Sequence, residues 1–353
     1  MAGIPLLLLA AAAGPPPLLA TNPHEKSAAV ARAHQPPAAA EPAGPESDAE
    51  AVHALPARPP DPVRLERARM RLSGTVASGR AGPYRLFTDL RNPERLRDLD
   101  HVAAQLEQIY TGRYGRKPIG EAAEVVVLYA RESDYLAFQD QDAKLANLRS
   151  SGHYGYGIVA LFDGGRPGGE VISTFVHELA HLLNRRALGP MLPSWLDEGI
   201  AEELGLSRVD GAGNLLPGTL GGIAVRGGQR IQMFGGRAQL YTLARGIAEG
   251  RTRRLRELLD LDWDAFVKAE GNLDYPQSAF WIRYLLTGEG GALAPGFRAF
   301  LDAVSVGSPP SPEALRERLG RSWDELEKGY AAWVTALAAD SAPELVTATP
   351  DGV

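Results

Sequence analysis

Two histidines one helical turn apart, with a glutamate directly after the first, are the residues of this sequence best suited to chemistry. They occur in the run FVHELAHL at residues 175–182. Positions four apart lie on one face of an α-helix, so His177 and His181 can direct ring nitrogens at one metal ion about 2.0–2.1 Å away. Glu178 is rotated by about 100° around the helix, which keeps it off the metal but close to a metal-activated water. This arrangement is typical of hydrolytic zinc sites.

The flanking sequence favours a helix that carries this motif. Apolar residues recur from Val171 through Leu183, and neither glycine nor proline interrupts them before Gly189-Pro190. Two simpler interpretations stand beside the zinc site: a motif that arose by chance, and two histidines satisfied in an ordinary core.

A catalytic zinc site needs a third protein ligand and one open position for water. The chain has no cysteine, and His181 is the last of its 7 histidines, so a downstream ligand must be Asp or Glu. The histidine-rich metzincin pattern is excluded, because Asn184 stands where that pattern needs glycine. Glu198 is favoured as the ligand because it lies early in a second helix, expected over residues 194–206 with Ser194 as its N-cap.

Other carboxylates surround Glu198 in the sequence. Glu202 lies one turn further along the same helix face, so we expect it to accept a hydrogen bond from a ligand histidine and fix the orientation of that ring. Taken singly, Asp197, Glu202 and Glu203 are more simply interpreted as a solvated helix face.

The motif HELAH, followed by LPSWLDEGIAEE at residues 192–203, resembles the gluzincin metallopeptidases, the clan of thermolysin and the zinc aminopeptidases. The WLxEG form is most similar to the aminopeptidase branch and to the peptidase-MA-like domains of bacterial exported proteins. The resemblance covers roughly residues 82–339 and implies that Glu198 is the third zinc ligand and Glu178 the general base. It also implies that Tyr275, at the start of YPQSAFWIRYL, donates a hydrogen bond to the oxyanion. The alternative for Tyr275 is an ordinary aromatic residue at a helix start.

The sequence departs from the aminopeptidases at one point. Their strand with a GAMEN-like motif, whose glutamate anchors the free amino end of the substrate, has no counterpart before the zinc helix. YGYGIVALFD at residues 154–163 stands there instead, and we expect one strand closed by Gly164-Gly165. The resemblance implies that this strand is a sheet edge, where an extended peptide could pair. Without an amine anchor, an endopeptidase-like cleft is expected.

These features predict zinc-dependent hydrolysis of peptide bonds in a polypeptide substrate, with Zn²⁺ as the cofactor. Two other functions share the same residues: a catalytically silent exported zinc-binding or scaffold module, and a zinc hydrolase of a non-peptide amide. Net charge of −6 and a pI near 5.7 give no general attraction to nucleic acid. The glycine-rich residues 218–222 lack the Gly-Lys-Ser/Thr ending of a phosphate-binding loop.

The beginning of the chain predicts export. Residues 6–13 are leucine and alanine only, a run too short for a bilayer span of about 20 residues but suited to a secretory signal over residues 1–20. No Lys or Arg precedes the run, and an Ala-rich leader is the alternative. We expect a periplasmic or extracellular protein without a transmembrane span in the mature chain. Residues 21–62 read as a disordered Ala/Pro-rich linker.

The fold class expected for residues 82–340 is α+β. A small mixed sheet with the zinc-bearing helix should occupy residues 82–189, and a mostly helical lobe residues 190–340. Residues 63–81 should be a short helix or linker, and residues 341–353 a loose tail. Residues 211–236 should be a plain surface loop, with a flexible flap or hairpin over the cleft as the alternative. Further expected elements are strands at 84–88 and 125–130, and helices from Asn92 onward and over 134–141, 239–249, 253–261, 277–287, 295–304, 312–319 and 323–339.

Overall fold

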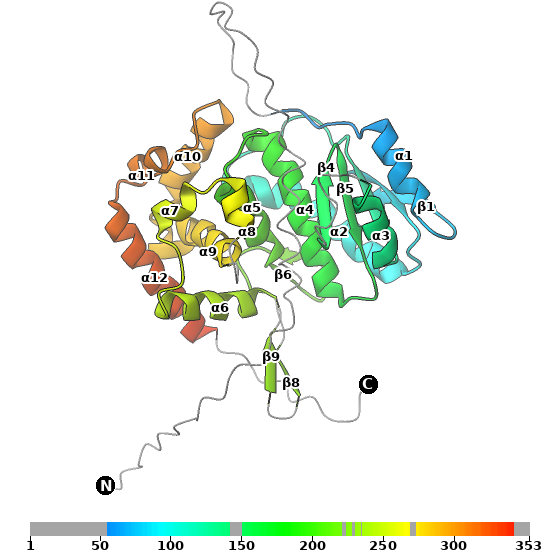
Figure 1. Cartoon of the computed structure of the whole chain (residues 1–353). Helices are drawn as coiled ribbons and strands as arrows, with labels where there is room; N and C mark the ends of the chain where they lie inside the picture. The colour runs from blue at the N-terminus through cyan, green and yellow to red at the C-terminus, as the bar shows by residue number, and fades with distance from the viewer. Residues whose placement is uncertain are drawn as a thin grey trace, which may run out of the picture.

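The computed structural model describes residues 55–141, 150–220, 224–227, 230–233, 235–268 and 273–341. A five-stranded mixed sheet with helices on both faces forms the N-terminal part, and the C-terminal part is mostly helical (Figure 1). This confirms the predicted fold class. The signal at residues 1–20, the linker at residues 21–54 and the tail beyond residue 341 lie outside the described residues.

The sheet has one parallel core with an antiparallel strand at each edge. β2 (Tyr84–Thr88), β3 (Val125–Tyr129) and β5 (Ile158–Phe162) are parallel neighbours. β1 (Ala77–Ala81) pairs antiparallel with β2, and β4 (Gly152–Gly155) pairs antiparallel with β5. Because the order is β1-β2-β3-β5-β4, β4 forms the edge that follows β5.

The single strand expected over residues 154–163 is wrong. The chain instead forms the β4–β5 hairpin, which turns at Tyr156 and Gly157, both with positive φ (53° and 75°). The edge is therefore β4, while β5, the strand directly before the zinc-motif helix, lies inside the sheet. Glycine is needed at position 157, because a Cβ there would lie 2.6 Å from the carbonyl oxygen of Arg58.

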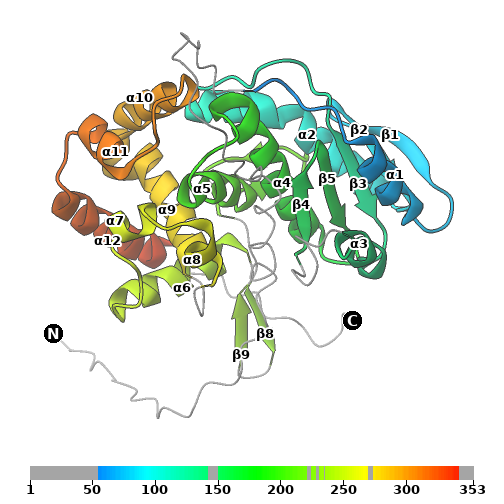
Figure 2. The same cartoon turned by 45° about the horizontal axis from the view of Figure 1, so that its top comes forward.

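Helices cover both faces of the sheet (Figure 2). α2 (Pro93–Tyr114) and α4 (Gly168–Leu188) pack on one face, and α1 (Pro62–Met70) and α3 (Glu132–Gln139) on the other. Side chains of β3 alternate between these two layers: Val126 and Leu128 join the first core cluster, and Val125 and Val127 the second. All five residues of β3 are buried, as its continuous apolar sequence predicts.

The folded domain begins earlier in the chain than the sequence indicated. Residues 55–61 cross the β4–β5 hairpin: the Asp61 N–H donates to the Tyr156 carbonyl, and the Arg58 N–H donates to Glu124 Oε1, both at 3.0 Å. The predicted linker is therefore wrong for these residues. Residues 63–81 contain the expected short helix within α1, but also the unexpected strand β1.

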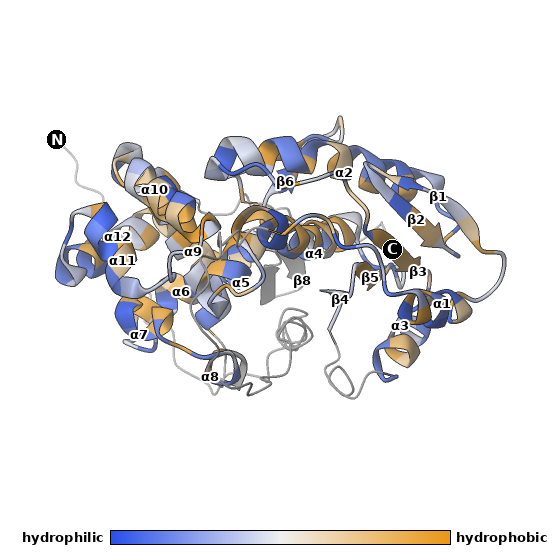
Figure 3. Ribbon diagram, turned by 90° about the horizontal axis from the view of Figure 1, so that it is seen from above, coloured by the Kyte–Doolittle hydropathy of each residue, from blue (hydrophilic) through white to orange (hydrophobic). Residues whose placement is uncertain are grey.

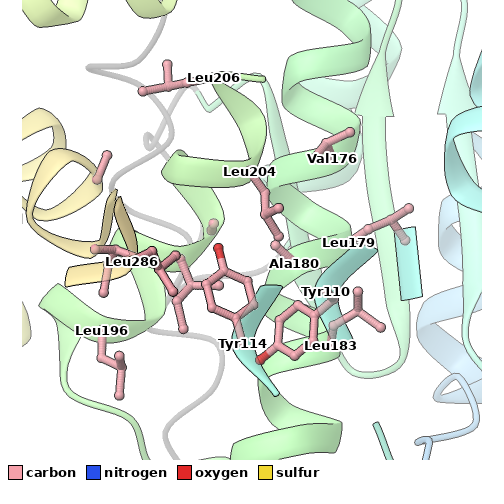
Figure 4. Packing of buried hydrophobic residues seen from close by; sticks show 14 of the residues in the cluster. Tyr110, Tyr114, Val176, Leu179, Ala180, Leu183, Leu196, Leu204, Leu206 and Leu286 are labelled. Carbon is pink, nitrogen blue, oxygen red and sulfur yellow. The ribbon is translucent and has the colours of Figure 1, made fainter. Parts of the chain in front are cut away.

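Helix α5 (Ser194–Gly205) connects the two parts of the molecule. It packs against α4 on one side and against α9 (Asp274–Thr287) on the other, and the buried residues between α2, α4 and α5 form one cluster (Figure 4). Ser194 is not the N-cap of α5: Pro193 occupies that position, without a side-chain hydrogen bond.

The expected C-terminal helices are present with shifted ends. The last helix begins with a capping box, in which the Ser322 hydroxyl accepts from the Glu325 N–H and the Ser322 N–H donates to Glu325 Oε2. The glycine-rich segment agrees better with the hairpin alternative than with a plain surface loop. It holds two short antiparallel ribbons, β6 (Arg208–Val209) with β7 (Leu215–Leu216) and β8 (Ala224–Gly227) with β9 (Arg230–Met233). None of the helices in the described part of the chain is long and apolar enough to cross a bilayer. The remaining helices are α6 (Gly236–Ala248), α7 (Leu255–Leu259), α8 (Trp263–Lys268), α10 (Ala294–Ser305), α11 (Pro312–Leu319) and α12 (Trp323–Asp340), with a 3-10 turn at Gly288–Gly291.

Candidate metal centre

The structure brings the three predicted ligands together where α4 and α5 pack. His177 Nε2 lies 3.1 Å from His181 Nε2, and Glu198 Oε2 lies 3.5 Å from the first and 3.6 Å from the second. All three side chains are buried, with exposed fractions of 5%, 4% and 1%. Both helices lie at the centre of the molecule and are rich in apolar residues (Figure 3).

These distances fit a tetrahedral zinc ion. With metal–ligand bonds of about 2.0–2.2 Å, neighbouring ligand atoms in a tetrahedral site are about 3.3–3.6 Å apart. The three observed separations of 3.1, 3.5 and 3.6 Å bracket that value. Two imidazole nitrogens and one carboxylate oxygen are also a usual donor set for zinc in hydrolytic enzymes. Among the described residues, these are the three side chains of this kind that could hold an ion.

The outer nitrogens of both histidines face carboxylates. His181 Nδ1 is 3.0 Å from Asp197 Oδ2, and His177 Nδ1 is 3.4 Å from Glu202 Oε1. Such carboxylates hold the ring proton on Nδ1 and leave the Nε2 lone pair free for a metal. Two lone pairs only 3.1 Å apart repel each other unless a cation or a proton lies between them.

The local charge favours a cation on these rings. Burial acts to lower the pKa of His181, but the negative charges of Asp197 and Glu198 outweigh it and raise the pKa to about 10. The pKa of His177 is also raised, since Glu198 and Glu202 overcome the effect of burial. The same carboxylates that attract a proton would attract a divalent ion.

A further layer of amides holds the supporting carboxylates. Asn184 Nδ2 donates to Asp197 Oδ1 at 2.7 Å, and the Tyr110 hydroxyl donates to Asn184 Oδ1 at 2.9 Å. In the same way, Gln239 Nε2 donates to Glu202 Oε2 at 3.2 Å. The expectation of a solvated Asp197 is wrong, because its side chain is only 19% exposed and lies against His181. The sequence signal that could have pointed to this arrangement is the polar Asn184, which follows the apolar Leu182 and Leu183 on a helix that packs into the core.

Glu178 lies between α4 and the edge strand β4. Its side chain is fully buried, and burial raises its pKa to about 7 although His177 and His181 act to lower it. A Cβ on Gly152 of β4 would lie 3.0 Å from Glu178 Cγ and 3.2 Å from its Oε1. The missing side chain at position 152 therefore lets the edge strand approach the carboxylate.

Tyr275 is also close to this cluster. It lies in the first turn of α9, which the Arg253–Asp274 ion pair (Nε–Oδ1 3.0 Å) ties to the preceding loop. Burial raises the pKa of Tyr275 well above its usual value, and Glu198 and Glu202 are near enough to raise it further. Its hydroxyl has no hydrogen-bond partner in the described part of the protein, so it is available to donate.

Glu203 is another carboxylate for which the expected solvent exposure is wrong. It is fully buried and accepts hydrogen bonds from Arg113 Nε (2.8 Å) and the Tyr114 hydroxyl (2.8 Å) on α2, and from Arg283 Nε (3.3 Å) on α9. Burial acts to raise its pKa, but the two arginines outweigh burial and lower it. These contacts tie α5 to α2 and α9, and so help to position Glu198 on the same helix.

A pocket of about 310 Å³ adjoins the ligand set on the side of His181. It is bounded by the end of α4, the loop from α4 to α5, and Tyr154 of β4. Trp263 of α8, in the helical C-terminal part, lines the pocket as well.

No protein-family model matches the sequence, and no curated protein matches it significantly. The likeness to gluzincins therefore depends on the two short motifs and on the geometry above.

Proposed function

We propose that this protein is a zinc-dependent peptidase of the gluzincin type, which cleaves bonds within a polypeptide chain. One observation carries the proposal: His177, His181 and Glu198 converge at tetrahedral spacing while Glu178 lies beside them. Carboxylates behind both rings support metal binding rather than simple core packing.

Each residue then has a defined task. A zinc ion in this site would activate a water molecule and polarise the carbonyl group of the substrate. Glu178 accepts the proton of that water and later delivers it to the leaving amine. Tyr275 donates a hydrogen bond to the carbonyl oxygen as negative charge develops there.

The edge strand supports a polypeptide substrate. β4 pairs with β5 on one side only, among the residues described, and its Gly152 lies next to Glu178. An extended peptide can pair with such an edge through main-chain hydrogen bonds, which would bring one of its carbonyl groups to Glu178.

The test combines metal analysis with digestion of a mixed peptide library, with and without a chelator. We expect about one zinc ion per chain, and cleavage of internal peptide bonds that the chelator abolishes and added zinc restores. Bound zinc without chelator-sensitive cleavage would favour a silent binding module. Non-peptide amides are tested in parallel, and hydrolysis confined to them would favour the alternative of a zinc hydrolase of a non-peptide amide.

A substitution of the general base sharpens this test. Glu178→Gln should retain zinc, and its cleavage rate should fall by about 100- to 10,000-fold, because the amide cannot accept the proton. Glu170→Gln in the first turn of the same helix makes the same chemical change away from the ligands and should keep activity. A fully active Glu178→Gln protein would contradict the mechanism.

A further inference from the structure

Arg185 places a positive charge in the pocket beside the ligand set. It follows His181 by four residues on α4, so both side chains lie on one helix face, about 6 Å apart along the axis, and both line the pocket of about 310 Å³. Much of the remaining wall is apolar, including Met191, Leu192 and Trp263. The pocket thus combines one fixed cation with hydrophobic walls.

The Arg185 guanidinium has no ion pair or hydrogen bond with any residue that the structure describes, and its Nε is buried without a partner. Its neighbour Arg186 is different: Nε donates to the Ile119 carbonyl at 3.1 Å, and Nη1 lies 3.6 Å from Glu107. Buried guanidinium nitrogens normally have acceptors, since leaving them unpaired is costly. Arg185 can therefore donate hydrogen bonds to an acceptor group of a ligand that enters the pocket.

The acid that lines the pocket is already engaged by groups other than Arg185. Asp197 is the acid that lines it, and its two oxygens already contact His181 Nδ1 (3.0 Å) and Asn184 Nδ2 (2.7 Å). Tyr154 stays neutral, because burial raises its pKa even though Arg185 is near enough to oppose that shift. Arg185 is thus close to the edge strand along which a peptide would lie.

We propose that Arg185 binds a carboxylate of the peptide substrate close to the scissile bond, and so selects substrates that carry an acidic side chain or a free C-terminus there. This inference rests on the proposed peptidase function. An extended peptide advances about 3.3–3.6 Å per residue, so a group one helical turn from His181 meets a substrate residue one or two positions from the cleaved bond. A guanidinium binds a carboxylate through two parallel hydrogen bonds.

Quenched fluorogenic peptides test this selection. One set places Glu or Gln at each position around the cleaved bond, and a second set ends in a free carboxylate or a carboxamide. We expect a fall of about 10- to 100-fold in kcat/KM when the preferred carboxylate becomes an amide. The set of peptides whose cleavage changes shows whether Arg185 binds a side-chain carboxylate or the C-terminal carboxylate of the substrate.

Variants of Arg185 then test whether this residue causes the preference for a carboxylate. Arg185→Gln should remove the discrimination between Glu and Gln, Arg185→Lys should keep part of it, and Arg185→Glu should reverse it in favour of Lys-containing peptides. Arg80→Gln is the matched control, because Arg80 lies on β1 at the opposite edge of the sheet, and it should keep the wild-type ratio. An unchanged ratio in Arg185→Gln would overturn the inference.

Binding to the Glu178→Gln protein gives a readout without turnover. Calorimetry should show the same preference for the carboxylate peptide, lost when Arg185→Gln is added. If wild-type protein shows no chelator-sensitive cleavage but this binding preference persists, the peptidase proposal fails and the carboxylate pocket stands. Cleavage without any dependence on a carboxylate or on Arg185 would refute the pocket alone.

Discussion

His177 and His181 of the candidate metal centre each have a carboxylate at the ring nitrogen that faces away from Glu198. Asp197 holds His181, Glu202 holds His177, and an amide from Asn184 or Gln239 holds each carboxylate in turn. Such layers fix the ring orientation and make the free nitrogen a better metal ligand. Metal affinity should therefore depend on residues that do not touch the ion.

Asp197→Ala tests this dependence. It should lower zinc affinity by about 10- to 100-fold, because His181 loses the acceptor that fixes its tautomer; competition with a chromophoric chelator measures the affinity. Asp302→Ala removes an exposed aspartate of α10 (57% exposed) and should leave the affinity unchanged. Equal affinities of Asp197→Ala and wild type would show that the contact has no role in metal binding.

At the scale of elements, the site depends on two close approaches of α4 and α5 to their neighbours. The edge strand β4 comes close to α4 at Gly152, and α5 is held between α2 and α9 through Glu203. A larger side chain at Gly152 would therefore clash with α4, and an uncharged side chain at Glu203 would leave its two arginines without a negative partner.

Gly152→Ala tests the first approach. The added Cβ would lie 2.8 Å from Thr174 Cγ2 and 3.0 Å from Glu178 Cγ, so β4 or α4 must move. We expect a loss of about 1–3 kcal/mol in unfolding free energy, measured by urea denaturation, together with lower cleavage activity. Gly79→Ala on β1, where no atom lies within 4 Å, is the control and should be much less harmful; equal losses would contradict the steric explanation.

Glu203→Gln tests the second approach. It leaves Arg113 and Arg283 near an uncharged group and should cost about 3–5 kcal/mol in unfolding free energy at neutral pH. Because the folded pKa of Glu203 is lowered, its contribution is present above the unfolded value of about 4.3 and is lost as pH falls through the folded pKa. The stability difference from wild type should therefore shrink in acid.

The matched control is Glu249, which also faces two arginines, Arg245 (2.7 Å) and Arg251 (2.6 Å), but at the surface. Glu249→Gln should change stability far less, since exposed pairs are screened by water. A difference between Glu203→Gln and wild type that stayed constant down to pH 2 would rule out the ionised Glu203 as its source.

At the scale of the molecule, the ligand set lies where the sheet layer meets the helical region. α4 packs on the sheet, and α5 packs on α9, so an ion bound by both helices would link the two parts. A ligand that binds only the folded state stabilises it by RT ln(1 + [L]/Kd), so the gain rises with the logarithm of the ligand concentration.

Zinc added to chelator-treated protein should raise its Tm. At 100 times the dissociation constant the gain is about 2.7 kcal/mol, read by calorimetry. His177→Ala should lose this rise because one ligand is missing, and magnesium should not replace zinc at a site with two imidazoles. A similar rise in His177→Ala would place the stabilising ion elsewhere.

The sequence by itself determined the features that arise within one element. The four-residue spacing of His177 and His181 puts both rings on one face of any helix, the apolar run at residues 125–129 specifies a buried strand, and Asn92 accepts from the Arg95 N–H at 3.0 Å to start α2 as predicted. Local backbone geometry decides these matters, so local sequence reveals them.

Only the tertiary structure decided what depends on contacts between elements. Neighbouring carboxylates on α5 look alike in sequence, yet Asp197 contacts α4 while Glu203 contacts α2 and α9. The identity of the edge strand, and the lack of a partner for Arg185 among the described residues, depend likewise on how distant segments pack. The physical reason is that burial, charge pairing and strand order are set by partners far away in the chain, whose positions no local pattern encodes.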